Sequence, residues 1–261
     1  MEKHNFKKKY GQNFLTDTNL LSAIVRDAGV TSQDCVVEIG MGQGALTEQL
    51  SKVAKKVYGF EIDLDLKAFL EEKFNESNVV LFFEDILKCN IQKLEEQIGG
   101  EYKVVANIPY YITTPIIFYF LENSNAKELC LMVQKEVAEK IVAKFKTKNY
   151  GILSVICQSF CECKVKRVVS KKLFTPSPKV DSAIISLIIK QKFDFDYAKF
   201  IKSSFSMRRK TLANNLAFNY NLSKTKVEKF LNDNGFASNV RAEELEVKSF
   251  KKLYEVFRQN L

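Results

Sequence analysis

The segment Asp34-Cys-Val-Val-Glu38-Ile-Gly40-Met-Gly42-Gln-Gly44-Ala-Leu-Thr47 contains the pattern that decides the fold. Its apolar start predicts a short buried strand, its glycines predict a turn, and the residues up to about Ala54 predict a helix. A strand, a glycine-rich turn and a helix in this order are typical of the nucleotide-binding start of an α/β sheet. We therefore expect an α/β protein that binds its ligand at the carboxyl ends of parallel strands.

Acidic side chains follow the next two predicted strands. Glu61 closes the strand expected over 56–60 and can accept hydrogen bonds from both hydroxyls of a ribose. Asp85 follows the strand expected over 78–83 and can accept from an adenine amino group while Ile86 lies on the ring. Because Gly40, Glu61 and Asp85 follow three successive strands, we expect them to surround a nucleoside, although unrelated surface acids are the alternative interpretation.

Asn107-Ile108-Pro109-Tyr110 follows a further apolar run that predicts a buried parallel strand. Pro109 fixes its own φ and lacks an N–H donor, so the amide oxygen of Asn107 and the adjacent carbonyls can accept hydrogen bonds from a planar amine. Such bonds would localise the lone pair of a nucleobase amino group or a glutamine amide, while the Tyr110 ring stacks on the substrate. A strand end followed by a proline turn is the structural alternative.

Two cofactor classes fit these motifs. Gly40, Gly42 and Ala45 match a relaxed dinucleotide fingerprint, and Glu61 follows about 20 residues later, as in nicotinamide enzymes. The Gly-x-Gly-x-Gly form, Glu38 before it and the Asn-Ile-Pro-Tyr segment instead indicate an S-adenosylmethionine enzyme.

Composition restricts the chemistry. The chain of 261 residues has one histidine, His4, which argues against Ser-His-Asp, Cys-His and multi-histidine metal sites. The six cysteines contain no Cys-x-x-Cys pair and predict buried free thiols, so we expect no metal. We also expect a cytoplasmic protein without membrane contact, because no run resembles a signal peptide or a membrane span. The protein is further expected to be a monomer.

Positive charge is concentrated at the two ends of the chain. Residues 1–9 have a net charge of +3, residues 10–190 are neutral, and residues 191–261 have +6. The last segment includes Arg208-Arg209-Lys210 at a predicted helix start, where arginines offer bidentate phosphate contacts. A neutral body with basic ends predicts a catalytic domain whose flanking parts bind a polyanion, although a solvated helix end is the alternative for the cluster.

The remaining pattern divides the chain into three parts. Residues 1–17 are a basic segment, 18–190 are expected to form a catalytic domain, and 191–261 are expected to form a basic helical domain that binds a polyanion. Helices are expected over 18–28, 113–121, 135–146, 149–160, 197–205, 211–219, 223–232 and 245–260, and further strands over 128–134, 162–169 and 183–190. The two-proline loop 174–182 is expected either as a structural corner or as a wall of the substrate pocket.

In this order the motifs resemble the small-subunit ribosomal RNA adenine dimethyltransferases, the kasugamycin-sensitivity methylases. The resemblance runs from Gln12-Asn13-Phe14-Leu15 through the glycine turn, Asn107–Tyr110 and Phe174–Asp181 to Arg208-Arg209-Lys210. It implies a seven-stranded, Rossmann-like methyltransferase sheet with an antiparallel last strand and a small helical domain. Ile108 departs from the usual Leu and is common in erythromycin-resistance methylases of large-subunit RNA.

The resemblance also implies the site and the activity. S-adenosylmethionine would contact Asn13, Leu15, Gly40, Glu61, Asp85 and Asn107; Asn107, Ile108, Pro109 and Tyr110 would be catalytic; and Arg208, Arg209 and Lys210 would bind RNA. The implied reaction is dimethylation of N6 on two adjacent adenosines near the 3′ end of small-subunit RNA in a pre-ribosomal particle. An erythromycin-resistance-type methylase, a protein glutamine methyltransferase and a non-catalytic assembly factor are the alternatives.

Overall fold

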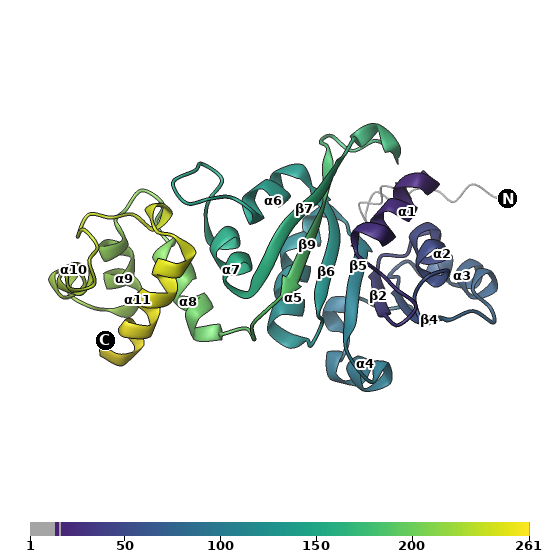
Figure 1. The fold of residues 1–261 in the computed structure, drawn as a ribbon, viewed down its shortest axis with the longest axis horizontal. Helices are drawn as coiled ribbons and strands as arrows, with labels where there is room; N and C mark the ends of the chain where they lie inside the picture. The colour runs from purple at the N-terminus through teal and green to yellow at the C-terminus, as the bar shows by residue number, and fades with distance from the viewer. Residues whose placement is uncertain (1–13, 16, 261) are drawn as a thin grey trace. The chain divides into compact units, whose positions relative to one another are not determined.

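The computed structural model describes residues 14, 15 and 17–260, which form two compact units (Figure 1). Among the described residues, the first unit contains those up to 138 together with 164–189. The second unit contains 139–163 and the residues from 190 onward.

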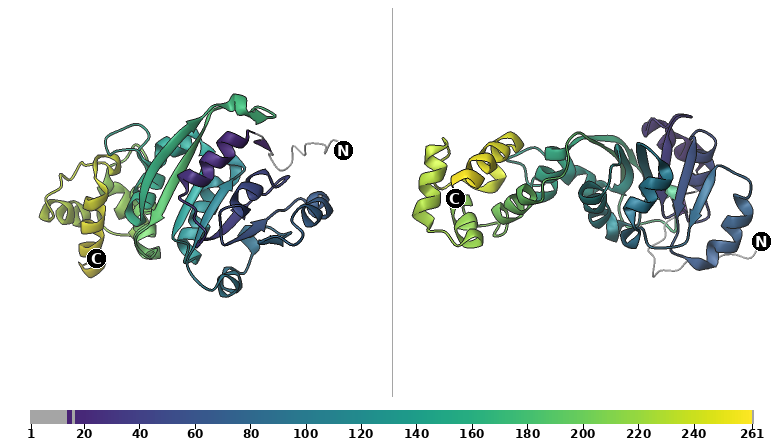
Figure 2. Two further views of the ribbon diagram at one scale, coloured as in Figure 1. Left: turned by 45° about the vertical axis from the view of Figure 1, so that its right-hand side comes forward. Right: turned by 90° about the horizontal axis from the view of Figure 1, so that it is seen from below.

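A seven-stranded sheet has the order β4-β3-β2-β5-β6-β9-β7. Its strands in chain order are β2 (Cys35–Ile39), β3 (Lys56–Phe60), β4 (Val79–Phe82), β5 (Tyr102–Asn107), β6 (Glu128–Gln134), β7 (Cys161–Val169) and β9 (Ser182–Ile189). Strands β4, β3, β2, β5 and β6 pair in parallel, whereas β9 pairs antiparallel to β6. Both further views show β7 running beside β9 at the edge of the sheet (Figure 2). The expected seven-stranded fold and its antiparallel last strand are confirmed.

Four helices connect the parallel strands, namely α2 (Ala45–Ser51), α3 (Lys67–Lys73), α4 (Ile91–Ile98) and α5 (Thr113–Asn123). Helix α1 (Thr18–Asp27) precedes β2, and α6 (Lys135–Ile141) follows β6. The 3-10 turns of this unit lie at Leu64–Leu66, Ile86–Lys88, Tyr110–Ile112 and Lys171–Leu173. Helix α1 begins after Asp17, whose side chain accepts from the backbone N–H of Leu20 at 3.0 Å and so caps the helix. Helices α1 and α2 pack against each other, and their apolar side chains share one core with Val36, Val57 and Val105 of the sheet.

A second, two-stranded sheet joins distant parts of the first unit. Strand β1 (Phe14–Leu15) pairs antiparallel with β8 (Phe174–Thr175), with Leu15 opposite Phe174. This pairing brings the two-proline loop next to the start of the described chain.

The second unit is helical and has an aromatic core. Its helices are α7 (Ile152–Phe160), α8 (Phe195–Ser204), α9 (Leu212–Tyr220), α10 (Lys224–Asp233) and α11 (Val247–Asn260), with a 3-10 turn at Ala242–Glu244. Phe257 lies at the centre of several ring contacts, with centroid distances of 4.7 Å to Tyr220 and 5.1 Å to Phe200. Such contacts stabilise a small helical unit by burying large apolar rings.

Some expected element boundaries were wrong. The helix expected over 135–146 ends at Ile141, and the next begins only at Ile152. Between them Lys146 adopts a left-handed φ of +63°, and its N–H donates to the carbonyl of Glu243 at 2.8 Å. This long-range bond replaces the local helical pattern. Helices α3 and α4 were not predicted.

Residues 139–163 belong to the C-terminal unit because α7 packs against α8 and α11. The expected boundary near 190 coincides with one junction between the units, and the assignment of separate functions to the parts stays a prediction. All six cysteines are free thiols; Cys89 and Cys163 are half-buried, and the other four are buried.

Candidate active site

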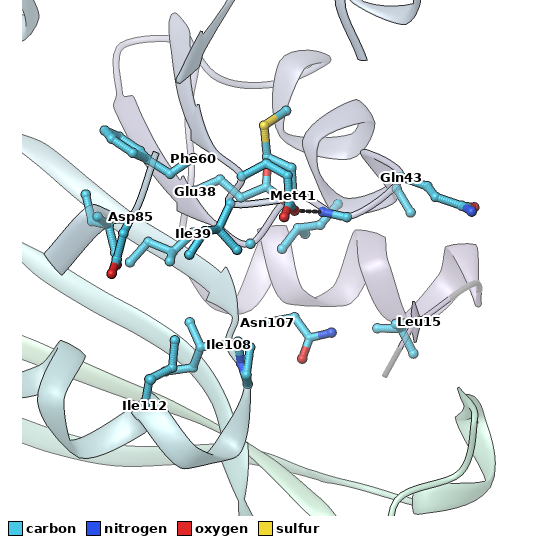
Figure 3. A pocket seen from close by; sticks show the side chains of 18 of the residues that line it. Leu15, Glu38, Ile39, Met41, Gln43, Phe60, Asp85, Asn107, Ile108 and Ile112 are labelled. Carbon is cyan, nitrogen blue, oxygen red and sulfur yellow. Dashed lines mark hydrogen bonds between the residues drawn. The ribbon is translucent and has the colours of Figure 1, made fainter. Parts of the chain in front are cut away.

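A cavity of about 240 Å³ lies where β2, β3, β4 and β5 end, at the carboxyl edge of the parallel strands (Figure 3). Its lining includes all but one of the predicted catalytic and cofactor-binding residues: Leu15, Gly40, Glu61, Asp85, Asn107, Ile108, Pro109 and Tyr110. Asn13, the other predicted cofactor contact, lies outside the described residues. The first unit therefore brings together residues that are spread over nearly 100 positions of the chain.

The glycine turn after β2 depends on left-handed backbone and on close packing. Gly40 and Gly44 have φ values of +74° and +73°, which side chains with a Cβ rarely adopt. A Cβ on Gly44 would lie 2.6 Å from the ring of Phe74. Lys73, next to Phe74, donates from its Nζ to the carbonyl of Gln43 at 3.2 Å and to that of Gly44 at 3.5 Å. The end of α3 therefore fixes the path of the turn.

Glu61 follows β3 and ties the glycine turn to that strand. It is 4% exposed; its Oε2 accepts from the N–H of Gly42 at 2.7 Å, and its Oε1 accepts from the N–H of Asp63 at 2.8 Å. The carboxylate that is expected to accept from ribose hydroxyls thus also binds two backbone N–H groups. Since each carboxylate oxygen can accept more than one hydrogen bond, Glu61 can still bind a ligand while it holds the turn.

Glu38 is the second buried carboxyl group of the cavity. It is 1% exposed, and its Oε2 has no hydrogen-bond partner among the described residues. Burial and the neighbouring Glu61 raise the pKa of Glu38, while Thr47 and Lys73 lower it, and the resulting pKa is about 8. The site therefore has a buried carboxyl group that is largely protonated below about pH 8 and whose Oε2 a ligand with donors or positive charge would satisfy.

Asp85 lies beyond β4, at the side of the cavity opposite Leu15 (Figure 3). Its Oδ1 accepts from the N–H of Leu87 at 3.0 Å and so begins the 3-10 turn Ile86–Lys88. The adjacent Ile86 also lines the cavity and is buried. The carboxylate of Asp85 and the apolar side chain of Ile86, which are expected to bind an adenine, thus lie side by side in the cavity.

The Asn-Ile-Pro-Tyr segment stands at the end of β5. Asn107 is the last residue of that strand, and its amide group points into the cavity (Figure 3). The side chain of Ile108 is 1% exposed and packs inward, so this position can offer a ligand only its backbone. The backbone oxygen of Asn107 would lie 3.9 Å from a Cβ placed on Gly40. The amine acceptors and the glycine turn are therefore neighbours.

Tyr110 is held by a residue that sequence reasoning missed. Its hydroxyl lies 2.7 Å from the Oγ of Ser182, the fully buried first residue of β9. Burial raises the pKa of Tyr110, and the bond to Ser182 lowers it. The bond fixes the far end of the ring and keeps it beside the cavity. Ser182 closes the two-proline loop, and that loop position was the only signal of its role.

The predicted RNA-binding cluster lies in the second unit. Arg208, Arg209 and Lys210 are exposed, and none of them forms an ion pair with another described residue. The buried Asn215 holds the preceding turn, because its amide accepts from the N–H of Met207 at 3.0 Å and donates to the carbonyl of Ser204 at 2.7 Å. Asn215 thus has a structural role.

Within the described part of the chain, no cluster of three or more His, Cys, Asp or Glu side chains is arranged to hold a metal ion. A search of the same residues finds no helix long and apolar enough to span a bilayer.

Comparison with known proteins identifies the family to which this chain belongs. A family model described as ribosomal RNA adenine dimethylase matches residues 3–259. The ribosomal RNA small subunit methyltransferase A of Bacillus licheniformis is 44% identical over 271 residues, covering 98% of this chain and 93% of the relative. Two solved structures have a similar fold. A dimethyladenosine transferase from Plasmodium falciparum has a TM-score of 0.78 and 28% identity, and the match covers 94% of this chain and 98% of that chain. The 23S rRNA methyltransferase ErmE has a TM-score of 0.71 and 26% identity, and the match covers 93% of this chain and 98% of that chain. With a match from end to end, this chain belongs to the ribosomal RNA adenine dimethylase family.

Proposed function

We propose that this protein uses S-adenosylmethionine to dimethylate N6 of two adjacent adenosines near the 3′ end of small-subunit ribosomal RNA during ribosome biogenesis. One observation supports this most directly: a single cavity is lined both by the nucleoside-bracketing residues and by Asn107–Tyr110. Membership of the adenine dimethylase family and the 44% identity to a small-subunit methyltransferase agree with this substrate.

The chemistry of the cavity fits the cofactor. Acceptors on Glu61 and Asp85 suit ribose hydroxyls and an adenine amino group, and Ile86 offers an apolar surface for the ring. The unpartnered Oε2 of Glu38 suits the donors and positive charge of the methionine part. S-adenosylmethionine supplies a methyl group that its sulfonium already activates.

The protein's own residues then position the amine. The amide oxygen of Asn107 and the backbone carbonyl of Ile108 accept from the N6 protons, which turns the lone pair toward the methyl group. The Tyr110 ring, oriented by Ser182, stacks on the adenine once it leaves its RNA stack. No strong base is required, because the leaving group is a neutral sulfide and the proton can pass to water. This agrees with a body of the protein that lacks histidine.

The second unit offers a surface for the RNA backbone. A hollow of about 620 Å³ is lined by the cations Lys140, Lys146, Lys148, Arg208 and Arg241, with Glu243 and Glu244. Arg241 is itself held by the carbonyl of Arg209 at 3.1 Å, so this part of the cluster is ordered. Such a set of cations suits phosphates, whose neutralisation makes RNA binding dependent on salt.

Labelled S-adenosylmethionine tests the proposal. The protein is incubated with immature small subunits, with large-subunit RNA and with a protein extract, and the labelled product is digested to nucleosides or amino acids. Label in N6,N6-dimethyladenosine from small subunits is expected, and Asn107→Ala serves as the inactive control. Label in large-subunit RNA would indicate an erythromycin-resistance type of activity, and labelled N-methylglutamine would indicate a protein substrate; either would contradict the proposal.

A further inference from the structure

The loop from Ser170 to Asp181 joins β7 to β9 and has three Lys and one Asp; we name it the basic loop. Together with the second half of β7, residues 164–180 contain six Lys or Arg and no Asp or Glu. Three of these cations, Lys171, Lys172 and Lys179, lie in the loop itself and are exposed. None of the three forms an ion pair with another described residue.

Internal hydrogen bonds give the basic loop a fixed shape. The N–H of Lys171 donates to Oδ1 of Asp181 at 3.0 Å, which joins the two ends of the loop. Across the loop, the hydroxyl of Ser177 donates to the carbonyl of Lys171 at 2.9 Å. The only carboxylate of the loop is thus bonded to its backbone, and the lysine charges are presented from an ordered scaffold.

Two contacts place the basic loop at the active site. Phe174 pairs with Leu15, which lines the cavity, and Ser182, directly after the loop, holds the Tyr110 hydroxyl. Figure 2 shows the loop at the end of β7 and β9, near the start of α1. Tyr111 also lines the cavity and is 64% exposed, so its ring is accessible to a nucleobase next to the target adenine.

Protection of a sheet edge does not explain these lysines. Charged residues on an edge strand such as β7 prevent pairing with another chain, and Lys166 can serve that purpose. Lys171, Lys172 and Lys179 lie beyond the end of β7 and outside its ladder. These lysines lie beside the proposed site for the target adenine. The RNA strand that contains this adenine carries phosphates on both sides of it, and these phosphates suit the lysine charges.

We propose that the basic loop binds the phosphates that flank the target adenosine and so guides the RNA strand into the cavity. This inference rests on the proposed function and adds a second phosphate-binding surface, on the catalytic unit, to the cluster at Arg208–Lys210. The loop would act on strand placement, and it would not contact the cofactor.

A charge-matched comparison tests this proposal. One variant changes Lys171, Lys172 and Lys179 to Gln; the control changes Lys55, Lys56 and Lys127 to Gln, which are exposed at the opposite ends of the parallel strands. Both variants lose three positive charges. Binding of a hairpin RNA with the two target adenosines is measured over a range of salt concentrations, and cofactor binding is measured by calorimetry.

The loop variant should bind RNA at least 10-fold more weakly, and the slope of log K against log salt should flatten by about 2–3 units, whereas the control changes by less than one. Cofactor affinity should not change in either variant. Equal salt slopes for the two variants would overturn the inference. If wild type methylates no RNA, the proposed function itself is wrong. Should the triple variant not fold, Lys172→Gln alone should flatten the slope by about one unit, and an unchanged slope would again overturn the inference.

Discussion

Replacement of Glu61 by Ala tests the cofactor site and its supporting structure together. The Glu61 carboxylate accepts two short backbone hydrogen bonds, from Gly42 at 2.7 Å and from Asp63 at 2.8 Å, and is 4% exposed. A hydrogen bond to a charged group contributes about 1.5–3 kcal/mol, and the two bonds share one acceptor group, so they are not additive. Glu61→Ala should therefore lower the free energy of unfolding by about 3 kcal/mol, since both buried donors lose their partner.

The same change should weaken S-adenosylmethionine binding by about 1.5–3 kcal/mol, which is a 10- to 150-fold rise in Kd. Calorimetry gives this Kd, and urea unfolding without cofactor gives the stability. Asp85→Ala is the matched control, because Asp85 accepts only a local bond from Leu87. It should also weaken cofactor binding, but it should lower the free energy of unfolding by only about 1 kcal/mol.

Two results would refute this reasoning. If Glu61→Ala unfolds at the wild-type urea concentration, the two backbone bonds do not hold the glycine turn. If it binds S-adenosylmethionine as wild type does, while wild type binds NAD tightly, the cavity is a dinucleotide site.

Four further predictions concern the cavity and the RNA surface. The pKa of Glu38 is about 8 in the folded protein and 4.5 ordinarily, so between these pH values the folded state binds more protons than the unfolded state. The free energy of unfolding should therefore fall by up to about 5 kcal/mol as pH rises through this window. Glu38→Gln should abolish this fall, which urea unfolding at about pH 5–8 measures. Asn107→Ala should cut the single-turnover methylation rate by about 10²–10³ at saturating substrates, while RNA affinity barely changes. Ser182→Ala and Tyr110→Phe should each lower that rate about 5-fold, and the double variant should fall no further, because both remove one bond; an additive loss would show that Ser182 does not act through Tyr110. Neutralising Arg208–Lys210 should flatten the salt slope of RNA binding by about 2–3 units and leave cofactor affinity unchanged; an unaltered slope would show that the cluster does not touch phosphate.

The sequence by itself determined the sheet class and the candidate cavity. Apolar runs with polar ends located β2, β3 and β5 closely, because local periodicity depends mainly on which face of each strand is buried. The carboxyl ends of parallel strands meet at one edge, so strand-end residues such as Glu61 and Asn107 had to lie together. The side chain of Ile108 is buried, which agrees with the expectation that this position offers a substrate only its backbone carbonyl.

Only the tertiary structure decided the contacts that do not follow from strand ends. Ser182 and Tyr110 are 72 positions apart and touch because β9 enters the sheet antiparallel beside β6. The grouping of residues 139–163 with the C-terminal helices likewise depends on α7 packing against α8 and α11. The local sequence pattern does not predict such contacts, because they depend on the order of the strands in the sheet and on how the helices pack. There a buried hydrogen bond or an apolar contact outweighs the helix or strand propensity of single residues.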